Sequence, residues 1–197
     1  MMRAFKQSYF ILSILRLLPH WLFFNMHPNS SIIKCDLITW MNANKINMEP
    51  QFGFLYLMTF YPEYRNLCYF RVGGIYRLLN IFCPKMDTLF ISTKNIGTGL
   101  FIQHGFSTII AAKSIGKNCW INQQVTIGYS NDNDCPIIMD NVSINAGAKV
   151  IGKVTVGENS IIGANAVVVK NVPSNCTVVG VPAYIVKRDG RKVKELL

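Results

Sequence analysis

The C-terminal half of the chain repeats an aliphatic residue every six positions. From residue 138 onward the period holds without a slip, at Ile138, Ile144, Val150, Val156, Ile162 and Val168. A small or β-branched residue follows four positions after each of these, at Val142, Ala148, Val154, Ser160, Ala166 and Val172. Upstream of a loop at 129–137 the period continues, with a one-residue slip near Thr108, at Ile96, Ile102, Ile109, Ile115, Ile121 and Ile127.

This period excludes an amphipathic helix and predicts a coil of short strands. Six is far from a multiple of the helical 3.6, and a simple strand has a period of two. One short strand plus a corner uses six residues, so three such units complete a coil of eighteen. We expect about four coils between residues 96 and 173, with the aliphatic columns as their core and Gly, Asn, Asp and Lys at the corners.

Five segments within residues 96–187 carry a resemblance to a known family. They read GLFIQHGFSTII, INQQVTIGYS, INAGAKVIGKVTVG, IIGANAVVVKNVP and VVGVPAYIV. They resemble the hexapeptide-repeat acyltransferases, and within them the serine acetyltransferase branch. The resemblance implies a left-handed parallel β-helix, a homotrimer with a hexamer as alternative, and acetyl transfer from acetyl-CoA to a hydroxyl. It also implies a preceding helical region, so we expect three parts: an α-helical region at 1–90, the left-handed β-helix acyltransferase domain at 91–186, and a basic C-terminal tail at 187–197.

Composition narrows the function classes. The net charge is +10 and is spread evenly along the chain, without a basic block interleaved with aromatic residues, so we expect no nucleic-acid partner. The charge would suit polyanionic CoA or an anionic membrane face, or it serves only solubility. The six cysteines show no CxxC pair and no zinc spacing, so we expect a reducing, cytoplasmic location and no metal; Cys119 occupies an inward position.

Residues Ser8–Phe24 form a very apolar segment that follows two basic residues. No small-residue cleavage site follows it, which argues against a signal peptide. Three residues interrupt it and argue against a spanning helix: Arg16, Pro19 and His20. We expect an interfacial or packed amphipathic helix, and peripheral membrane contact would place the protein at the inner face of the membrane. Helical spacing recurs at 33–44 and 62–81.

His104 is the candidate general base. Acetylation of a hydroxyl needs a base with a near-neutral pKa, and histidine supplies one. His104 follows the aliphatic Ile102 by two residues, at a corner that faces outward, and the resemblance gives it the family's catalytic position. Gln123 should stack beside it, with Gln124 next. These two amides could orient an acceptor or form a structural ladder.

A candidate acetyl-CoA groove follows from the spacing of small residues. Ala146 and Ala164 are eighteen residues apart and therefore lie in one column, which leaves a channel for the pantetheine arm. The resemblance implies that this stretch, Gly147 included, contacts CoA. It also implies that basic side chains lie near the nucleotide and its 3′-phosphate, unless they are a solvated end: Lys170, Lys187 and Arg188, with Arg191 and Lys192 adding charge.

The acceptor side departs from serine acetyltransferases. The Asp that precedes the family's catalytic His by fifteen residues is here Leu89, and the Asp directly before that His is Gln103. The family's Arg–His pair ahead of a Pro corresponds to Asp134 and Cys135. We therefore expect an acceptor pocket rebuilt for a sugar or polysaccharide hydroxyl, with serine acetylation for cysteine biosynthesis as the alternative and a non-catalytic scaffold as a third reading. Its predicted acceptor-binding residues are Gln103, Gln123, Gln124 and Asp134.

Overall fold

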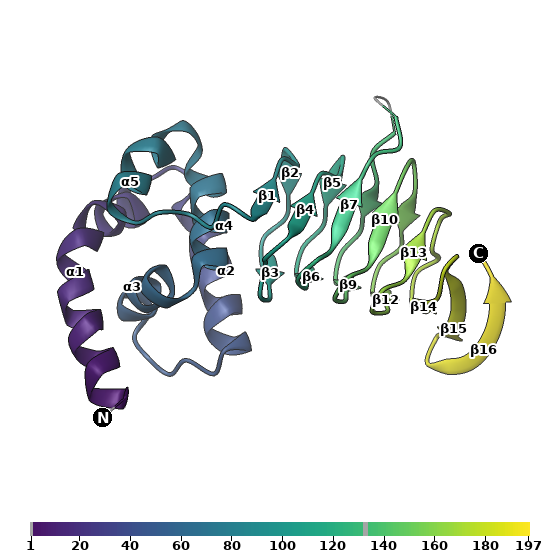
Figure 1. Cartoon of the computed structure of the whole chain (residues 1–197), viewed down its shortest axis with the longest axis horizontal. Helices are drawn as coiled ribbons and strands as arrows, with labels where there is room; N and C mark the ends of the chain where they lie inside the picture. The colour runs from purple at the N-terminus through teal and green to yellow at the C-terminus, as the bar shows by residue number, and fades with distance from the viewer. Residues whose placement is uncertain (1, 132–133) are drawn as a thin grey trace. The chain divides into compact units, whose positions relative to one another are not determined.

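The structure is a computed structural model that describes residues 2–131 and 134–197 (Figure 1). The chain divides into two compact units, residues 1–86 and residues 87–197. The first unit is helical and the second is a coil of strands, so each is described by itself.

The first unit contains five α-helices and one 3₁₀ helix in its described part. They are α1 (Met2–Met26), α2 (Ser30–Ala43), α3 (Pro50–Phe60), α4 (Pro62–Val72), η1 (Gly73–Ile75) and α5 (Tyr76–Phe82). Proline stands in the first turn of α3 and α4, where its missing N–H costs nothing. Pro19, expected to interrupt the apolar segment, instead lies inside α1, because packing of that helix on its neighbours offsets the lost hydrogen bond. The expected helical N-terminal region is confirmed.

Aromatic side chains hold α1 against α3. Phe10 meets Tyr56 edge-on with ring centroids 5.7 Å apart, and Phe24 stacks on Phe54 at 4.3 Å. Between these contacts the buried His20 shares a 2.8 Å hydrogen bond with the Tyr69 hydroxyl. Desolvation by burial lowers the pKa of His20 to about 4, so it is neutral at physiological pH. One side of the apolar Ser8–Phe24 segment is therefore packed in the helical unit.

A buried ion pair joins α2 to α4. Arg71 Nε donates to Asp36 Oδ2 at 2.8 Å and Arg71 Nη2 donates to Asp36 Oδ1 at 3.4 Å. The two residues are 6% and 1% exposed. Two opposite charges this deeply buried are tolerated because each offsets the desolvation cost of the other.

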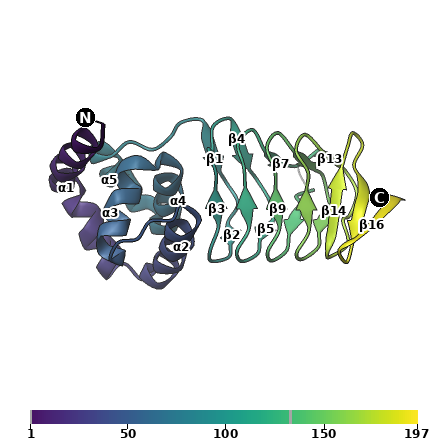
Figure 2. The ribbon, with the colours of Figure 1, turned by 90° about the horizontal axis from the view of Figure 1, so that it is seen from below.

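The second unit is a left-handed parallel β-helix built from three sheets (Figure 2). Successive strands visit the three sheets in turn, so each strand pairs with one about a coil away. The first sheet contains β1 (Leu89–Ile91), β4 (Thr108–Ile110), β7 (Thr126–Gly128), β10 (Lys149–Ile151) and β13 (Val167–Val168). The second contains β2 (Asn95–Ile96), β5 (Ser114–Ile115), β8 (Ile137–Ile138) and β11 (Thr155–Val156). The third contains β3 (Phe101–Ile102), β6 (Trp120–Ile121), β9 (Ser143–Ile144), β12 (Ile161–Ile162), β14 (Cys176–Val179), β15 (Tyr184–Arg188) and β16 (Arg191–Leu196).

The aliphatic columns form the core of the coil as predicted. The six anchors from Ile138 to Val168 are at most 1% exposed, and the six residues that follow them by four positions are at most 4% exposed. The upstream anchor at Ile109 is wrong: Ile109 is 43% exposed, whereas Ile110 is fully buried and pairs with Ile127. The predicted net slip of one residue between Ile102 and Ile115 holds, but it divides into an interval of eight residues up to Ile110 and one of five after it. The longer interval contains a turn with two left-handed residues, His104 (φ 55°) and Ser107 (φ 52°).

Asparagines stack along one corner of the coil, as expected of corner positions. Four of them have φ between 54° and 58°, the left-handed region that Asn tolerates better than most residues: Asn118, Asn141, Asn159 and Asn175. Their side-chain amides hydrogen-bond from coil to coil at 3.5, 3.1 and 3.0 Å. This ladder satisfies polar groups at the corner and fixes the coil register.

Both ends of the β-helix differ from the predicted boundaries. The coil begins at β1 and not after residue 90, because Leu89 pairs with Thr108 and Ile91 with Ile110. At the other end, residues 187–197 are not a separate tail. They complete β15, which pairs antiparallel with β14, and form β16, which pairs antiparallel with β15, so both strands extend the third sheet.

Candidate functional site

His104 projects from a corner of the coil, just after β3. The residue is exposed and left-handed, which turns its side chain out of the core and confirms the outward position. Ile102 pairs with Ile121, and the Gln103 amide donates to the Ile121 carbonyl at 2.8 Å, so Gln123 lies in the corresponding position of the next coil. Within the part of this chain that the structure describes, the imidazole makes no side-chain hydrogen bond, which leaves both ring nitrogens available to a ligand.

The residues at the position equivalent to His104 become smaller in successive coils. Register pairs join Ile102, Ile121, Ile144, Ile162 and Val178 through successive strands of the third sheet. Two residues beyond these stand His104, Gln123, Ala146, Ala164 and Gly180. The predicted stacking of Ala146 and Ala164 is therefore present, Ala146 half-buried and Ala164 exposed. Small side chains here leave the backbone open to a narrow ligand along the column.

Trp120 and Asn122 stand beside the predicted Gln103 and were missed from the sequence. Trp120 Nε1 donates to Asn122 Oδ1 at 2.7 Å and to Gln103 Oε1 at 3.3 Å. The Trp120 ring also packs on Phe101 with centroids 4.3 Å apart. Their sequence signal is positional, because Trp120 lies one coil beyond Phe101 and Asn122 one coil beyond Gln103. Gln103 thus belongs to a hydrogen-bonded group with an aromatic neighbour.

Gln124 is exposed and left-handed at φ 58°. Its backbone carbonyl accepts a 2.6 Å hydrogen bond from Lys149 Nζ, while the Gln123 carbonyl accepts one of 3.0 Å from the Gly147 amide. The two glutamine backbones therefore hold the next coil in place. That their side chains orient an acceptor, or instead form a structural ladder, stays a prediction.

Asp134 organises its own loop. Its carboxylate accepts hydrogen bonds from the Ser130 hydroxyl, the Ser130 amide at 2.7 Å, the Asn131 amide at 2.9 Å and Asn131 Nδ2 at 3.1 Å. The Ser130 hydroxyl bond, followed by the backbone bonds, lowers the pKa of Asp134. The carboxylate is thus already engaged, and an acceptor would compete with these bonds. Part of the predicted loop at 129–137 falls on residues 132 and 133, outside the described residues.

The predicted phosphate-binding residues meet the C-terminal strand. Lys170 Nζ donates to the Leu197 carbonyl at 2.8 Å, and Arg188 Nη2 pairs with Glu195 Oε2 at 2.5 Å. Lys187 is exposed on β15. Of these three residues, only Lys187 makes no side-chain hydrogen bond or ion pair within the described part of the chain. It could therefore bind a phosphate without first breaking another contact.

Cys119 is buried as predicted. The residue is 1% exposed, and desolvation raises the pKa of its thiol to about 11. Such a thiol is a poor nucleophile at neutral pH because almost none of it is thiolate.

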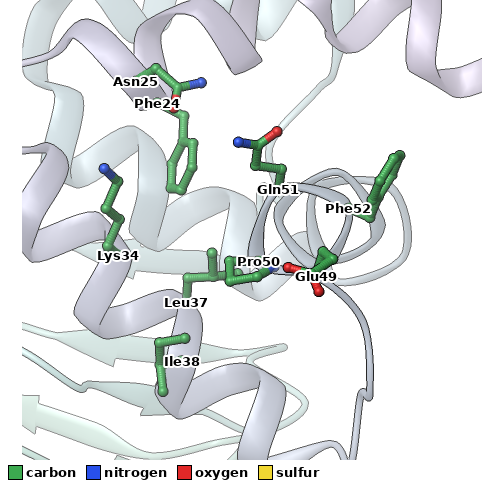
Figure 3. A pocket seen from close by; sticks show the side chains of 9 residues that line it. All are labelled: Phe24, Asn25, Lys34, Leu37, Ile38, Glu49, Pro50, Gln51 and Phe52. Atoms are coloured by element: carbon green, nitrogen blue, oxygen red, sulfur yellow. The ribbon is translucent and has the colours of Figure 1, made fainter.

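A cavity of about 490 Å³ lies in the helical unit and contains none of the predicted site residues (Figure 3). Its lining residues are Phe24, Asn25, Lys34, Leu37, Ile38, Glu49, Pro50, Gln51 and Phe52. The corner of the β-helix with His104, and not this cavity, therefore holds the predicted chemistry.

Comparisons with known proteins identify the class of fold and then a branch of it. Residues 135–170 match the family described as bacterial transferase hexapeptide (six repeats). The chain is similar to serine acetyltransferases of Staphylococcus xylosus, 49% identical over 102 residues, and of Synechococcus elongatus, 43% identical over 105 residues. These matches cover 50% and 51% of this chain, and 47% and 43% of the relatives, so the chain matches less than half the length of either.

A solved structure extends the likeness to the fold. The serine acetyltransferase of Neisseria gonorrhoeae in complex with serine aligns with a TM-score of 0.63 and 29% identity, covering 82% of this chain and 70% of that one. The resemblance to hexapeptide-repeat acyltransferases of the serine acetyltransferase branch is confirmed.

Proposed function

We propose that this protein is an acetyl-CoA-dependent O-acetyltransferase whose acceptor is L-serine. The observation that carries the proposal is a histidine held outward at a corner of a hexapeptide coil, above a column of small residues. Over 102 residues the chain is also 49% identical to a serine acetyltransferase. The relatives' name favours serine over the sugar acceptor that the sequence suggested. Acetyl-CoA as co-substrate follows from the same class of enzyme.

His104 acts as the general base. As the acceptor hydroxyl attacks the thioester carbonyl carbon, the imidazole takes the hydroxyl proton, and the carbon–sulfur bond then breaks. The proton passes to the departing CoA thiolate, so the products are the O-acetyl ester and free CoA. We infer direct transfer from acetyl-CoA to the acceptor; Cys119 is buried, and burial raises the pKa of its thiol to about 11, so it is a poor nucleophile for an acetyl-enzyme intermediate.

The open column beside His104 supports the placement of the co-substrate. Ala146 and Ala164 leave room for the pantetheine arm along successive coils, and the exposed Lys187 supplies positive charge for the nucleotide phosphates. Arg188 and Lys170 would join it only by leaving Glu195 and the Leu197 carbonyl.

A sugar hydroxyl is the second candidate acceptor. The group around Gln103 favours it, because a neutral amide beside Trp120 and Phe101 presents hydrogen-bonding and apolar surface but no charge. Asp134, where the family has a positive charge, would repel the carboxylate of serine. The homotrimer, the hexamer alternative and the cytoplasmic location remain predictions.

The test is release of free CoA thiol from acetyl-CoA with purified protein, with L-serine and with a panel of sugars, nucleotide sugars and glycan fragments. Turnover with serine supports the proposal. Turnover with a glycan and none with serine would refute L-serine as the acceptor and support a sugar hydroxyl instead.

The same assay separates the base from a structural histidine. We expect His104→Ala to lower the rate at least about 100-fold, the usual scale for a general base, and His27→Ala to leave it unchanged. A His104→Ala protein with full activity would refute the mechanism.

A further inference from the structure

Helix α1 is apolar on two opposite faces. One face is buried in the helical unit and includes Leu17, His20 and Phe24, none more than 3% exposed. The opposite face is open, and its side chains are between 49% and 80% exposed: Ile11, Leu12, Leu15, Leu18, Leu22 and Met26. Five of these six recur at helical spacing, so they form one continuous stripe. A helix that is apolar all round is normally covered on all sides.

The packed face of α1 argues against a helix that crosses a membrane. By length and composition Ser8–Met26 could span one, and 22% of that stretch is buried, so the argument rests on where the packed face is attached. Phe10 near one end and Phe24 near the other both pack on aromatic residues of α3, at centroid distances of 5.7 and 4.3 Å. A helix tied to a folded unit along this length can lie on a bilayer but cannot enter it end-on.

The sequence that contains α1 carries charge of one sign. Residues 1–35 contain no Asp or Glu, whereas Arg3, Lys6 and Arg16 all belong to the α1 segment. The first acidic residue, Asp36, is buried in its ion pair. Arg16 Nη2 donates to the Tyr9 hydroxyl at 3.1 Å, which keeps that cation beside the partly exposed Tyr9 ring. An anionic lipid surface attracts a segment of this charge that also exposes apolar side chains.

We propose that the open face of α1 docks on an anionic lipid surface, with the helix lying parallel to the membrane plane. This goes beyond acetyl transfer, since it concerns where the enzyme works. A second copy of the chain fits the face less well, because two acid-free helices would bring like charges together, whereas lipid headgroups supply the opposite charge. Helix α5, which packs against α1, has exposed apolar side chains of its own, Leu78 and Ile81.

Vesicle co-sedimentation of the full chain tests the proposal. The probes are vesicles of phosphatidylcholine alone and vesicles with about 30% phosphatidylglycerol. We expect binding to the anionic vesicles and at least about tenfold weaker binding to the neutral ones. The double variant Leu12→Gln, Leu15→Gln should weaken anionic binding at least about tenfold, because both side chains are over 70% exposed and leave water only on docking.

Two controls keep the result decisive. Ile38→Gln, on α2 and 46% exposed, changes an apolar side chain of the same unit outside α1 and should bind as the unchanged protein does. Thermal unfolding of the double variant should match that of the unchanged protein, since the leucines make no buried contact. A protein that stays in the supernatant with both vesicles overturns the proposal. A double variant that binds the anionic vesicles normally also overturns it. So does a double variant that binds less and has a smaller oligomeric mass than the unchanged protein, because that result would assign the face to contact with another copy of the chain.

Discussion

The buried ion pair of the helical unit predicts a large loss of stability when one partner is removed. Asp36→Ala deletes a carboxylate that is 1% exposed and that accepts two hydrogen bonds from Arg71, at 2.8 and 3.4 Å. The guanidinium then stays buried without its counter-charge. Each charge-assisted bond is worth about 1.5–3 kcal/mol, and breaking a buried pair costs about 3–5 kcal/mol in all.

Urea unfolding followed by circular dichroism at 222 nm measures this loss. All helices in the described residues lie between residues 2 and 82, so the helical signal reports the first unit. We expect the free energy of unfolding of that unit to fall by about 3–5 kcal/mol in Asp36→Ala. Glu49→Ala removes the same charge from an exposed residue without a side-chain cap bond, and should cost less than about 0.5 kcal/mol.

The double variant Asp36→Leu, Arg71→Met separates pairing from packing. Replacing both partners by apolar residues removes the unpaired charge, so stability should return to within about 1 kcal/mol of the unchanged protein. A loss of less than about 1 kcal/mol in Asp36→Ala alone would refute the reasoning, because the remaining guanidinium would then be finding water.

Two further predictions concern His20 and the core column. The pKa of His20 is about 4 in the folded state and 6.5 when unfolded, so the unfolded state takes up the proton first as the pH falls. The free energy of unfolding therefore falls as the pH drops from 6.5 toward 4, by about 2.5 kcal/mol between pH 7 and pH 4.5. His20→Gln should remove the share of this loss that comes from His20, which is measured by comparing the unfolding free energies of both proteins at the two pH values. Ile162→Ala empties a fully buried position and should cost about 2–5 kcal/mol in thermal unfolding, whereas Ile161→Ala, 41% exposed on the same strand, should cost under about 1 kcal/mol. Equal costs for the two isoleucines would contradict the assigned core.

The periodic part of the fold was predictable because, outside the loop at 129–137, each coil pairs with the next at an offset close to eighteen residues. The position of Ile144 beside Ile162, for example, follows from that spacing alone. The same spacing placed His104 outward and aligned Ala146 with Ala164. These predictions did not depend on contacts between distant parts of the chain.

The features that could not be predicted are those that the six-residue spacing does not determine. The turn after β3 uses left-handed His104 and Ser107, and neither is a glycine or asparagine that would signal such a turn. The engagement of Arg188 by Glu195 depends on an antiparallel pairing with a register shift, which hexads do not encode. The hydrogen bonds of Asp134 depend on Ser130 and Asn131 lying beside its carboxylate, which spacing does not encode, so its charge alone suggested a binding role.

Strands β15 and β16 cover the open edge of the third sheet at the C-terminal end of the stacked coils. A parallel coil ends in a strand with unpaired backbone groups, onto which a coil of another molecule could add end to end. Here β14 is covered by antiparallel β15, and the outermost strand β16 carries Arg191, Lys192 and Lys194 along its edge. Charged side chains on an edge repel an incoming copy, so the solenoid is protected at this end against growth into fibres.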